Sequence, residues 1–301
     1  MTMALFKGAA TALITPFTVN DEIDYASFAD IIEYQIGEGI DALVVCGTTG
    51  ESATLTIRER KELIAFAVSV ADGRVPVIAG TGSNSTYRTV SLSEDAANAG
   101  ADGLLIVTPY YNKASRSGLI EHYETVAKTV PLPIIVYNVP SRTGLNVSPE
   151  VYAELMKIDN IVGIKEANGN ISSCAKTLSL CPDAEIYSGN DADTIPIMSL
   201  GGLGVISVAS NILPRMLSDM CRLFEKGEVE KAARLQIMLC KLNECLFSEV
   251  NPIPIKYAMS RLGFCENILR LPLTPLSDYN AVKLDRCLEE FFAPDAFETK
   301  I

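Results

Sequence analysis

Short apolar runs alternate with amphipathic helical segments along most of the chain, and this alternation constrains the fold more than any other feature. Eight such runs occur, at residues 10–17, 42–47, 75–81, 103–109, 133–138, 161–167, 184–190 and 204–210. Runs that are apolar on both faces are typical of parallel strands covered by helices. The intervening segments carry helix-start signals, such as the potential capping box of Thr56 with Glu59, and Ser148 before Pro149.

Eight strand-then-helix units predict a closed (β/α)8 barrel, known as a TIM barrel, a fold that typically takes roughly 250 residues. We therefore expect a catalytic barrel over residues 1–225. An open, doubly wound sheet is the alternative arrangement. From about Pro214 onward the sequence has helical patterns and no further strand signal, so a C-terminal helical region is expected over residues 226–301.

The charge balance argues against one class of partner. The chain has 25 lysines and arginines against 37 aspartates and glutamates, a formal net charge of −12. Nucleic-acid-binding proteins usually present a basic face, so no nucleic-acid partner is expected. Residues 1–17 contain too short an apolar stretch for a signal peptide, and no other run is long enough for a membrane helix. We expect a cytoplasmic protein with no membrane partner.

Potential metal ligands are scattered along the chain. The 8 cysteines occur without a C-x-x-C pair or a neighbouring histidine, so no metal site is expected. The single histidine, His122, lies in a helical pattern, where a surface or capping role is expected. Acid–base chemistry therefore has to fall to lysine, tyrosine, threonine or carboxylate side chains.

Lys165 is the most unusual residue of the apolar runs. In "IVGIKEA" it places an ammonium group where a further apolar side chain is expected. A buried ammonium is costly unless it is paired or used chemically. A lysine at a strand end can also extend to solvent, so this motif alone leaves both interpretations open.

In a (β/α)8 barrel the residues at the carboxyl ends of the strands converge on one mouth. The segments at these ends are "GTTGES" with Thr48 and Thr49, "PYYN" with Tyr110 and Tyr111, "YNVPSRTG" with Tyr137 and Arg142, "GIKEA" with Lys165, "YSGND" with Gly189, and "GVISV" with Ile206. Taken singly, the glycines fit tight turns and the tyrosines fit packing. Their convergence around one lysine favours a functional pocket.

The chemistry of such a pocket follows from its lysine. Burial disfavours the ammonium form, which leaves a neutral amine able to attack a ketone and form an imine. Tyrosine and threonine hydroxyls can carry the protons that this requires. The guanidinium of Arg142 suits a carboxylate. We predict a Schiff-base lyase or synthase that acts on a 2-keto acid.

Several motifs together resemble the dihydrodipicolinate synthase family, within the pyruvate-dependent class I aldolase and N-acetylneuraminate lyase superfamily. The motifs are "GTTGESATL", "PVIAGTGSN", "VTPYYN", "YNVPSRTG", "GIKEA", "GVISV", "NPIPIK" and "LRLPLTPL". They extend from about Phe6 to about Leu276 in one order. The resemblance implies a homotetrameric barrel, a dimer of dimers. It also implies condensation of pyruvate with L-aspartate 4-semialdehyde, without a metal or organic cofactor.

The resemblance also implies roles for four catalytic residues. Lys165 would form the imine with pyruvate, and Tyr137 would donate and accept the protons. Thr48 would link Tyr137 to Tyr111 in a proton relay. In this family the residue that matches Tyr111 reaches across a subunit interface into the neighbouring site.

Four further positions match the substrate-binding residues of the family. Thr49 and Ile206 would contact pyruvate, and Gly189 is a further candidate for substrate binding. Arg142 would receive the carboxylate of the semialdehyde.

Two alternatives remain at this stage, and a third is rejected. An N-acetylneuraminate lyase shares the barrel, the lysine and the tyrosine, but Arg142 in "SRTG" favours a short electrophile that carries a carboxylate. A non-catalytic protein that binds keto acids is a rival of another class, which the intact set of reactive residues disfavours. The segment "GTGSNST" is similar to a dinucleotide-binding loop, but Ser85 replaces the third glycine, so dinucleotide binding is rejected.

Regulation is where the chain departs from the family that it resembles. Members inhibited by L-lysine bind it in a cleft at the tetramer interface. Three of the cleft positions match the family pattern, namely Ala53, Asn84 and Tyr110. Ile57 and Arg60 stand where the family has histidines, and Arg88 stands where it has glutamate. Added cations disfavour a ligand with two ammonium groups, so we expect weak or absent inhibition by L-lysine.

Overall fold

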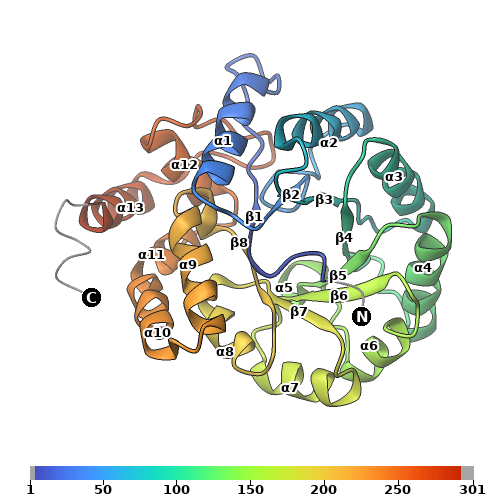
Figure 1. The fold of residues 1–301 in the computed structure, drawn as a ribbon. Helices are drawn as coiled ribbons and strands as arrows, with labels where there is room; N and C mark the ends of the chain where they lie inside the picture. Colours follow the sequence, from blue (N-terminus) through green and yellow to red (C-terminus); the bar gives the residue numbers. More distant parts are fainter. Residues whose placement is uncertain (1–3, 293–301) are drawn as a thin grey trace.

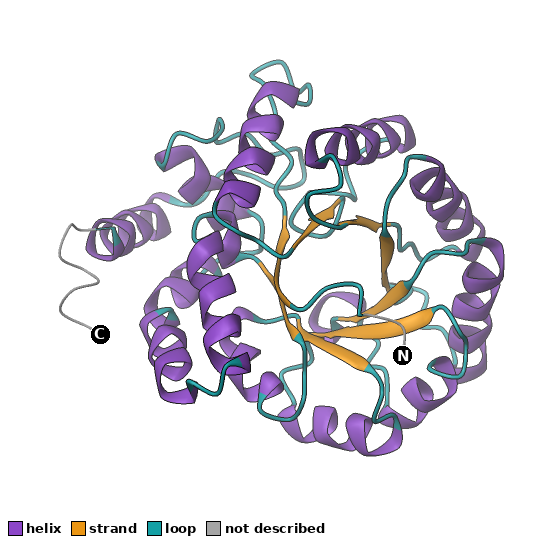
Figure 2. Ribbon diagram, viewed as in Figure 1, coloured by secondary structure: helices purple, strands orange, loops and turns teal. Residues whose placement is uncertain are grey.

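The computed structural model describes residues 4–292 of the chain. Within them, eight parallel strands close into a barrel in which each strand pairs with the next and β8 pairs with β1 (Figures 1 and 2). The strands are β1 (Gly8–Ala12), β2 (Ala42–Val45), β3 (Val77–Gly80), β4 (Gly103–Val107), β5 (Ile134–Asn138), β6 (Ile161–Glu166), β7 (Glu185–Ser188) and β8 (Gly204–Ser207). The predicted (β/α)8 barrel is confirmed, and the open-sheet alternative is wrong.

The helices form an outer ring around the strands (Figure 2). Those of the ring are α1 (Tyr25–Gly37), α2 (Ile57–Ala71), α3 (Thr86–Asn98), α4 (Arg116–Thr129), α6 (Pro149–Leu155), α7 (Ile171–Leu180), α8 (Thr194–Met198) and α9 (Pro214–Glu225). The short helix α5 (Pro140–Thr143) follows β5 and lies within the ring in the view of Figure 1. The predicted capping box is present, since the Thr56 hydroxyl accepts from the Glu59 backbone and the Glu59 carboxylate accepts from the Thr56 backbone. Helix α6 begins at Pro149, directly after Ser148, as the sequence predicts.

The helices that follow the barrel are α10 (Val229–Met238), α11 (Cys240–Leu246), α12 (Ile253–Arg261) and α13 (Asp278–Phe291). Helix α10 packs on α9, so this region continues the outer ring before it turns away toward α12 and α13 (Figure 1). Of the helical region expected over residues 226–301, residues 293–301 lie outside the described residues. The division of the chain at residue 225 stays a prediction.

The first predicted strand differs from the observed one. The apolar run at residues 10–17 suggested a strand, but β1 begins at Gly8 and ends at Ala12. Leu13, Ile14 and Phe17 are fully or almost fully buried, yet they lie in the segment that leaves the sheet. Their hydrophobicity reflects burial beneath the helical layer rather than strand pairing, and an apolar run alone does not distinguish the two.

The interior of the barrel is a packed core. Side chains that fill it include Phe6, Ala10, Val44, Ile78, Leu105, Ile135, Tyr187 and Ile206. Phe6 stacks on Tyr187 with ring centroids 4.2 Å apart, and the Tyr187 hydroxyl donates to the Phe6 carbonyl at 2.7 Å. Phe6 and Tyr187 therefore fill the barrel at the amino-terminal ends of its strands. Solvent and substrate therefore reach the interior from the opposite end, where the carboxyl ends of the strands lie.

His122 lies in a different setting from the one expected. Its ring is buried on α4, so the expected surface or capping role is wrong. Nδ1 lies 3.0 Å from the Thr86 hydroxyl, and burial lowers the pKa of the ring to about 4. The imidazole is therefore neutral at physiological pH.

None of the helices formed by residues 4–292 is long and apolar enough to cross a membrane. Over the same residues, no three His, Cys, Asp or Glu side chains are grouped in a way that could hold a metal ion.

Candidate active site

A pocket with a volume of about 170 Å³ opens at the carboxyl ends of the strands. Six of the predicted site residues line it, namely Thr48, Thr49, Tyr137, Arg142, Lys165 and Gly189. They come from the ends of β2, β5, β6 and β7, so the barrel itself brings them together. Asn190, Phe247 and Asn251 complete part of the wall.

Two predicted residues do not line this pocket. The side chain of Ile206 is fully buried inside the barrel, among the core residues next to Tyr137. Tyr111 is 90% exposed and has a φ of 72° in the loop after β4. The roles assigned to both residues stay predictions.

Lys165 lies inside the barrel on β6, with only 5% of its surface exposed. It is opposite Tyr137 in the pairing of β5 with β6, and its Nζ lies 4.5 Å from the centre of the Tyr137 ring. Burial lowers the pKa of Lys165 to about 8, although the nearby Asp191 carboxylate raises it and the Arg142 charge lowers it further. A substantial fraction of the amine is therefore neutral near neutral pH, as a nucleophile requires.

Asp191 is a charged residue of the site that the sequence analysis did not assign. It is the last residue of "YSGND", and its side chain is buried. One carboxylate oxygen accepts from the Ser207 hydroxyl, and the other accepts from the backbone of Val208 at 3.0 Å and Ala209 at 3.2 Å. Burial raises the pKa of Asp191, which these hydrogen bonds partly offset. The carboxylate limits how far the pKa of Lys165 falls.

Tyr137 occupies the centre of the pocket wall. Burial raises the pKa of its phenol, while the Arg142 charge and a hydrogen bond with the Thr48 side chain lower it in part. The phenol is therefore protonated at physiological pH and able to donate. Its contact with Thr48 and the position of Lys165 Nζ over its ring fit the predicted relay, which stays a prediction.

Asn251 joins two substrate-binding candidates. Its side-chain amide donates to the Thr49 hydroxyl at 3.0 Å, and its backbone carbonyl accepts from Nη2 of Arg142 at 2.9 Å. The residue belongs to "NPIPIK", directly before α12, and lies 202 positions after Thr49. Its place at the pocket could not be predicted from local pattern, because it depends on how the C-terminal region folds back onto the barrel.

Glu166 is adjacent to Lys165 in sequence but faces the opposite side of β6. Its carboxylate accepts from the Tyr152 hydroxyl at 3.0 Å, the Asn138 amide at 2.9 Å and the Asn168 backbone at 2.9 Å. Burial raises its pKa to about 7. These bonds fix the end of β6 from outside the barrel, so Glu166 supports the strand that carries the lysine.

Gly189 has a steric role at the mouth. A Cβ atom there would lie 2.7 Å from the Cβ of Ala167 and 3.0 Å from the carbonyl of Glu166. Its backbone N–H also donates to that carbonyl at 2.7 Å. Only glycine lets the end of β7 come this close to the segment that follows Lys165.

A closed (β/α)8 barrel with a desolvated lysine, a tyrosine and an arginine at its mouth is the architecture of a lysine Schiff-base enzyme. The chain belongs to the dihydrodipicolinate synthetase family, whose model matches residues 5–291. Enzymes of this family are lyases that work through a lysine Schiff base, and the relatives below carry the name of the synthase.

The chain is 50% identical to the 4-hydroxy-tetrahydrodipicolinate synthase of Alkaliphilus oremlandii over 281 residues, which cover 93% of the chain and 97% of the relative. It superposes on the dihydrodipicolinate synthase from Aquifex aeolicus with a TM-score of 0.94 and 44% identity, covering 96% of this chain and 99% of that one. A monomeric variant of dihydrodipicolinate synthase gives a TM-score of 0.93 and 44% identity, with 95% and 97% covered.

Proposed function

We propose that the chain condenses pyruvate with L-aspartate 4-semialdehyde to 4-hydroxy-tetrahydrodipicolinate and water, the first committed step of lysine biosynthesis through diaminopimelate. The observation that carries the proposal is Lys165, a buried amine with a pKa of about 8 in the pocket of a chain 50% identical to such a synthase.

In the first half of the reaction, the neutral amine of Lys165 attacks the keto carbon of pyruvate. The departing hydroxyl takes a proton from Tyr137 and leaves as water, which gives the imine. Loss of a proton from the methyl carbon then gives the enamine, and Tyr137 with Thr48 is the route for these protons. Thr49, Gly189 and the backbone near Ile206 are the proposed contacts of the pyruvate carboxylate.

In the second half, the enamine carbon attacks the aldehyde of the semialdehyde, and the new alkoxide takes a proton. The amino group of the semialdehyde then displaces Lys165 from the imine, which closes the ring and returns the free amine. Arg142 binds the semialdehyde carboxylate, and the carbonyl of Asn251 holds its guanidinium in place at 2.9 Å. A planar guanidinium suits a carboxylate better than an ammonium group does.

A direct assay tests the function and separates it from the two rivals. The protein is incubated with pyruvate and L-aspartate 4-semialdehyde, and the cyclic product is followed by mass spectrometry. A parallel reaction replaces the semialdehyde with N-acetylmannosamine. Turnover with the semialdehyde alone supports the proposal. Turnover with the sugar alone indicates an N-acetylneuraminate lyase, and turnover with neither substrate indicates a protein that binds keto acids without catalysis.

The proposal includes a homotetramer, a dimer of dimers, in the cytoplasm. Tyr87, Tyr110 and Tyr111 are exposed side chains on neighbouring segments, joined by the Asn112 amide, which donates to the Asn84 carbonyl at 2.8 Å. Exposed aromatic side chains gathered in this way are typical of an interface. In the proposed assembly, Tyr111 completes the relay of the neighbouring site. Sedimentation velocity reports the assembly, and a monomer with full activity would contradict this role of Tyr111.

L-Lysine is expected to inhibit the enzyme weakly or not at all. Burial lowers the pKa of the Arg60 guanidinium, and the neighbouring Arg88 charge lowers it further. Nη2 of Arg60 donates to the Gly80 carbonyl at 2.6 Å. The Arg60 guanidinium therefore lies near both Tyr110 and a second cation, Arg88, in the region where a ligand with two ammonium groups would have to bind. Initial rates are measured at saturating pyruvate with rising L-lysine. Half-inhibition below 1 mM would contradict this charge argument.

A further inference from the structure

The loop after β2 carries Thr48 and Thr49. Two cationic residues of the C-terminal region, Lys256 and Arg270, contact this loop. We propose that Glu51, Lys256 and Arg270 form a clamp that positions this loop for the reaction with pyruvate. The clamp is defined as these three residues, none of which lines the pocket. The inference rests on the proposed function, because it assigns the clamp an effect on the pyruvate half of the reaction.

Glu51 is the clamp residue that lies on the loop after β2. Its carboxylate is fully buried and pairs with the equally buried ammonium of Lys256 on α12. The other carboxylate oxygen accepts from the Arg270 backbone N–H at 3.0 Å. A buried charge of this kind persists only when it is paired and hydrogen-bonded. The loop after β2 is therefore tied to two separate points of the C-terminal region.

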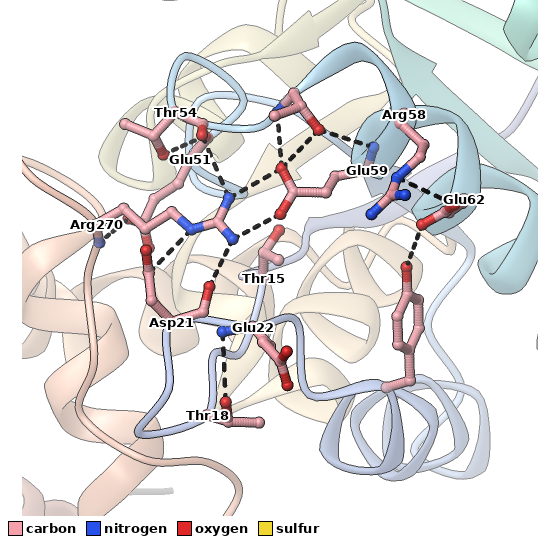
Figure 3. A network of polar contacts seen from close by, with 12 residues as sticks. Thr15, Thr18, Asp21, Glu22, Glu51, Thr54, Arg58, Glu59, Glu62 and Arg270 are labelled. Carbon is pink, nitrogen blue, oxygen red and sulfur yellow. Dashed lines mark hydrogen bonds and ion pairs between the residues drawn. The ribbon is translucent and has the colours of Figure 1, made fainter.

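The side chain of Arg270 binds the far end of the same loop (Figure 3). Its guanidinium donates to both oxygens of Glu59, at 2.6 and 3.0 Å, and to the Thr54 carbonyl at 3.3 Å. It also donates to Asp21, with Nε at 3.0 Å from the side chain. Because Glu59 caps α2, one arginine joins the end of the loop, the start of α2 and the C-terminal region.

Phe17 connects the two cations of the clamp. Its ring is fully buried, with Nζ of Lys256 4.1 Å and Cζ of Arg270 4.4 Å from the ring centre. Cations over an aromatic face are attracted to it, and more strongly when water is excluded. The ring therefore holds both cations in fixed positions relative to Glu51.

Two residues of the loop have an energetically unfavourable backbone conformation, which contacts with the clamp can stabilise. Cys46 and Glu51 have φ values of 56° and 53°, in the left-handed region that residues other than glycine rarely adopt. They bracket Thr48 and Thr49. Backbone strain of this kind persists only where the surrounding contacts fix the conformation. The clamp supplies such contacts at Glu51 and Thr54, which keep the two threonines in place.

A backbone hydrogen bond connects Glu51 of the clamp with Thr48. The backbone N–H of Glu51 donates to the Thr48 carbonyl at 3.1 Å, and the Gly50 carbonyl accepts from the Thr15 hydroxyl at 2.8 Å. A change at Glu51 therefore moves Thr48 directly, and Thr48 contacts Tyr137. Arg142 lies on α5 and hydrogen-bonds to Asn251 rather than to a clamp residue, so it provides an internal reference.

The test compares Glu51→Gln, Arg270→Lys and Arg270→Met with the parent chain. Displacement of catalytic groups by about 1 Å can cost on the order of 100-fold, so we expect kcat/KM for pyruvate to fall by about 10- to 100-fold in Glu51→Gln and Arg270→Met. The KM for the semialdehyde should change less than about 2-fold, because Arg142 is outside the clamp. Arg270→Lys should recover only part of the loss, since an ammonium cannot bind Glu59 with two parallel bonds. Borohydride trapping of the pyruvate imine should slow in parallel.

Glu51→Gln leaves the Lys256 ammonium unpaired and can prevent folding. The double variant Glu51→Gln with Lys256→Met removes both charges and keeps the volume similar, and it should show the same loss for pyruvate. Leu284→Ala is the matched control, because Leu284 is fully buried on α13 and is not one of the clamp residues. It should lower stability while it leaves both kinetic constants near the parent values.

Three results would overturn the inference. They are unchanged kcat/KM for pyruvate in the folded variants, equal losses for both substrates, and an equal loss in Leu284→Ala. Failure of the proposed function gives a different result, since the parent chain itself would then form no cyclic product from pyruvate and the semialdehyde.

Discussion

Tyr137→Phe is expected to lower kcat by about 10²- to 10⁴-fold, the range that a general acid–base group contributes. The phenol is protonated because burial raises its pKa, and it lies over the amine of Lys165. Phenylalanine keeps the ring and its packing inside the barrel but removes the only atom that can carry a proton. Imine formation should slow, because the hydroxyl that leaves as water loses its donor. Steady-state kinetics and single-turnover trapping with borohydride measure the two effects.

Tyr123→Phe is the matched control for this prediction. Tyr123 is also fully buried, and its hydroxyl donates to the Ile106 carbonyl at 2.9 Å, but it lies on α4 outside the barrel. Loss of a buried hydrogen bond should cost about 1 kcal/mol of stability and leave turnover unchanged. Parental turnover in Tyr137→Phe, or an equal kinetic loss in both variants, would contradict the assignment of Tyr137 as proton carrier.

Arg142→Ala is expected to raise the KM for L-aspartate 4-semialdehyde and to lower turnover, with a much smaller effect on pyruvate. A charge-assisted hydrogen bond is worth about 1.5–3 kcal/mol, which corresponds to roughly 10- to 150-fold in kcat/KM. The guanidinium lines the pocket, and the Asn251 carbonyl fixes its orientation. Initial rates over a matrix of both substrate concentrations separate the two KM values.

Arg142→Lys should rescue only part of this loss, because an ammonium group cannot make two parallel bonds to a carboxylate. Arg261→Ala removes an exposed arginine that pairs with Asp285 on the C-terminal helices, and it serves as the control for loss of positive charge. Equal losses for pyruvate and the semialdehyde in Arg142→Ala would indicate a structural role for Arg142.

The barrel and the centre of its pocket were predictable because both depend on local pattern. Eight apolar runs alternate with helical segments, and the closing of such a sheet brings strand ends together whatever their separation in sequence. Lys165 stood out because it interrupts an apolar run, and burial is what sets its pKa near 8. The predictions for Leu13 and His122 were wrong because both side chains are buried by tertiary packing. The local sequence pattern does not show such packing.

The rest of the site depends on long-range contacts that the pattern does not contain. Asn251 reaches Thr49 over 202 positions, and Arg270 reaches Glu51 over 219 positions. These contacts arise because the C-terminal helices fold back onto the loop after β2. Asp191 was visible in "YSGND" but not distinguishable from a turn residue, since its importance comes from its burial and from its charge near Lys165.

The identity of the nucleophile is the central claim, and trapping of the pyruvate imine tests it most directly. The chain is incubated with pyruvate and sodium borohydride, digested, and mapped by mass spectrometry, with Lys165→Met as the negative control. We predict a single adduct on Lys165, formed faster as the pH rises through about 8, where more of the amine is neutral. Lys256 is buried too, but its ammonium is paired with Glu51. An adduct on Lys256 or another lysine, or none at all, would contradict the account.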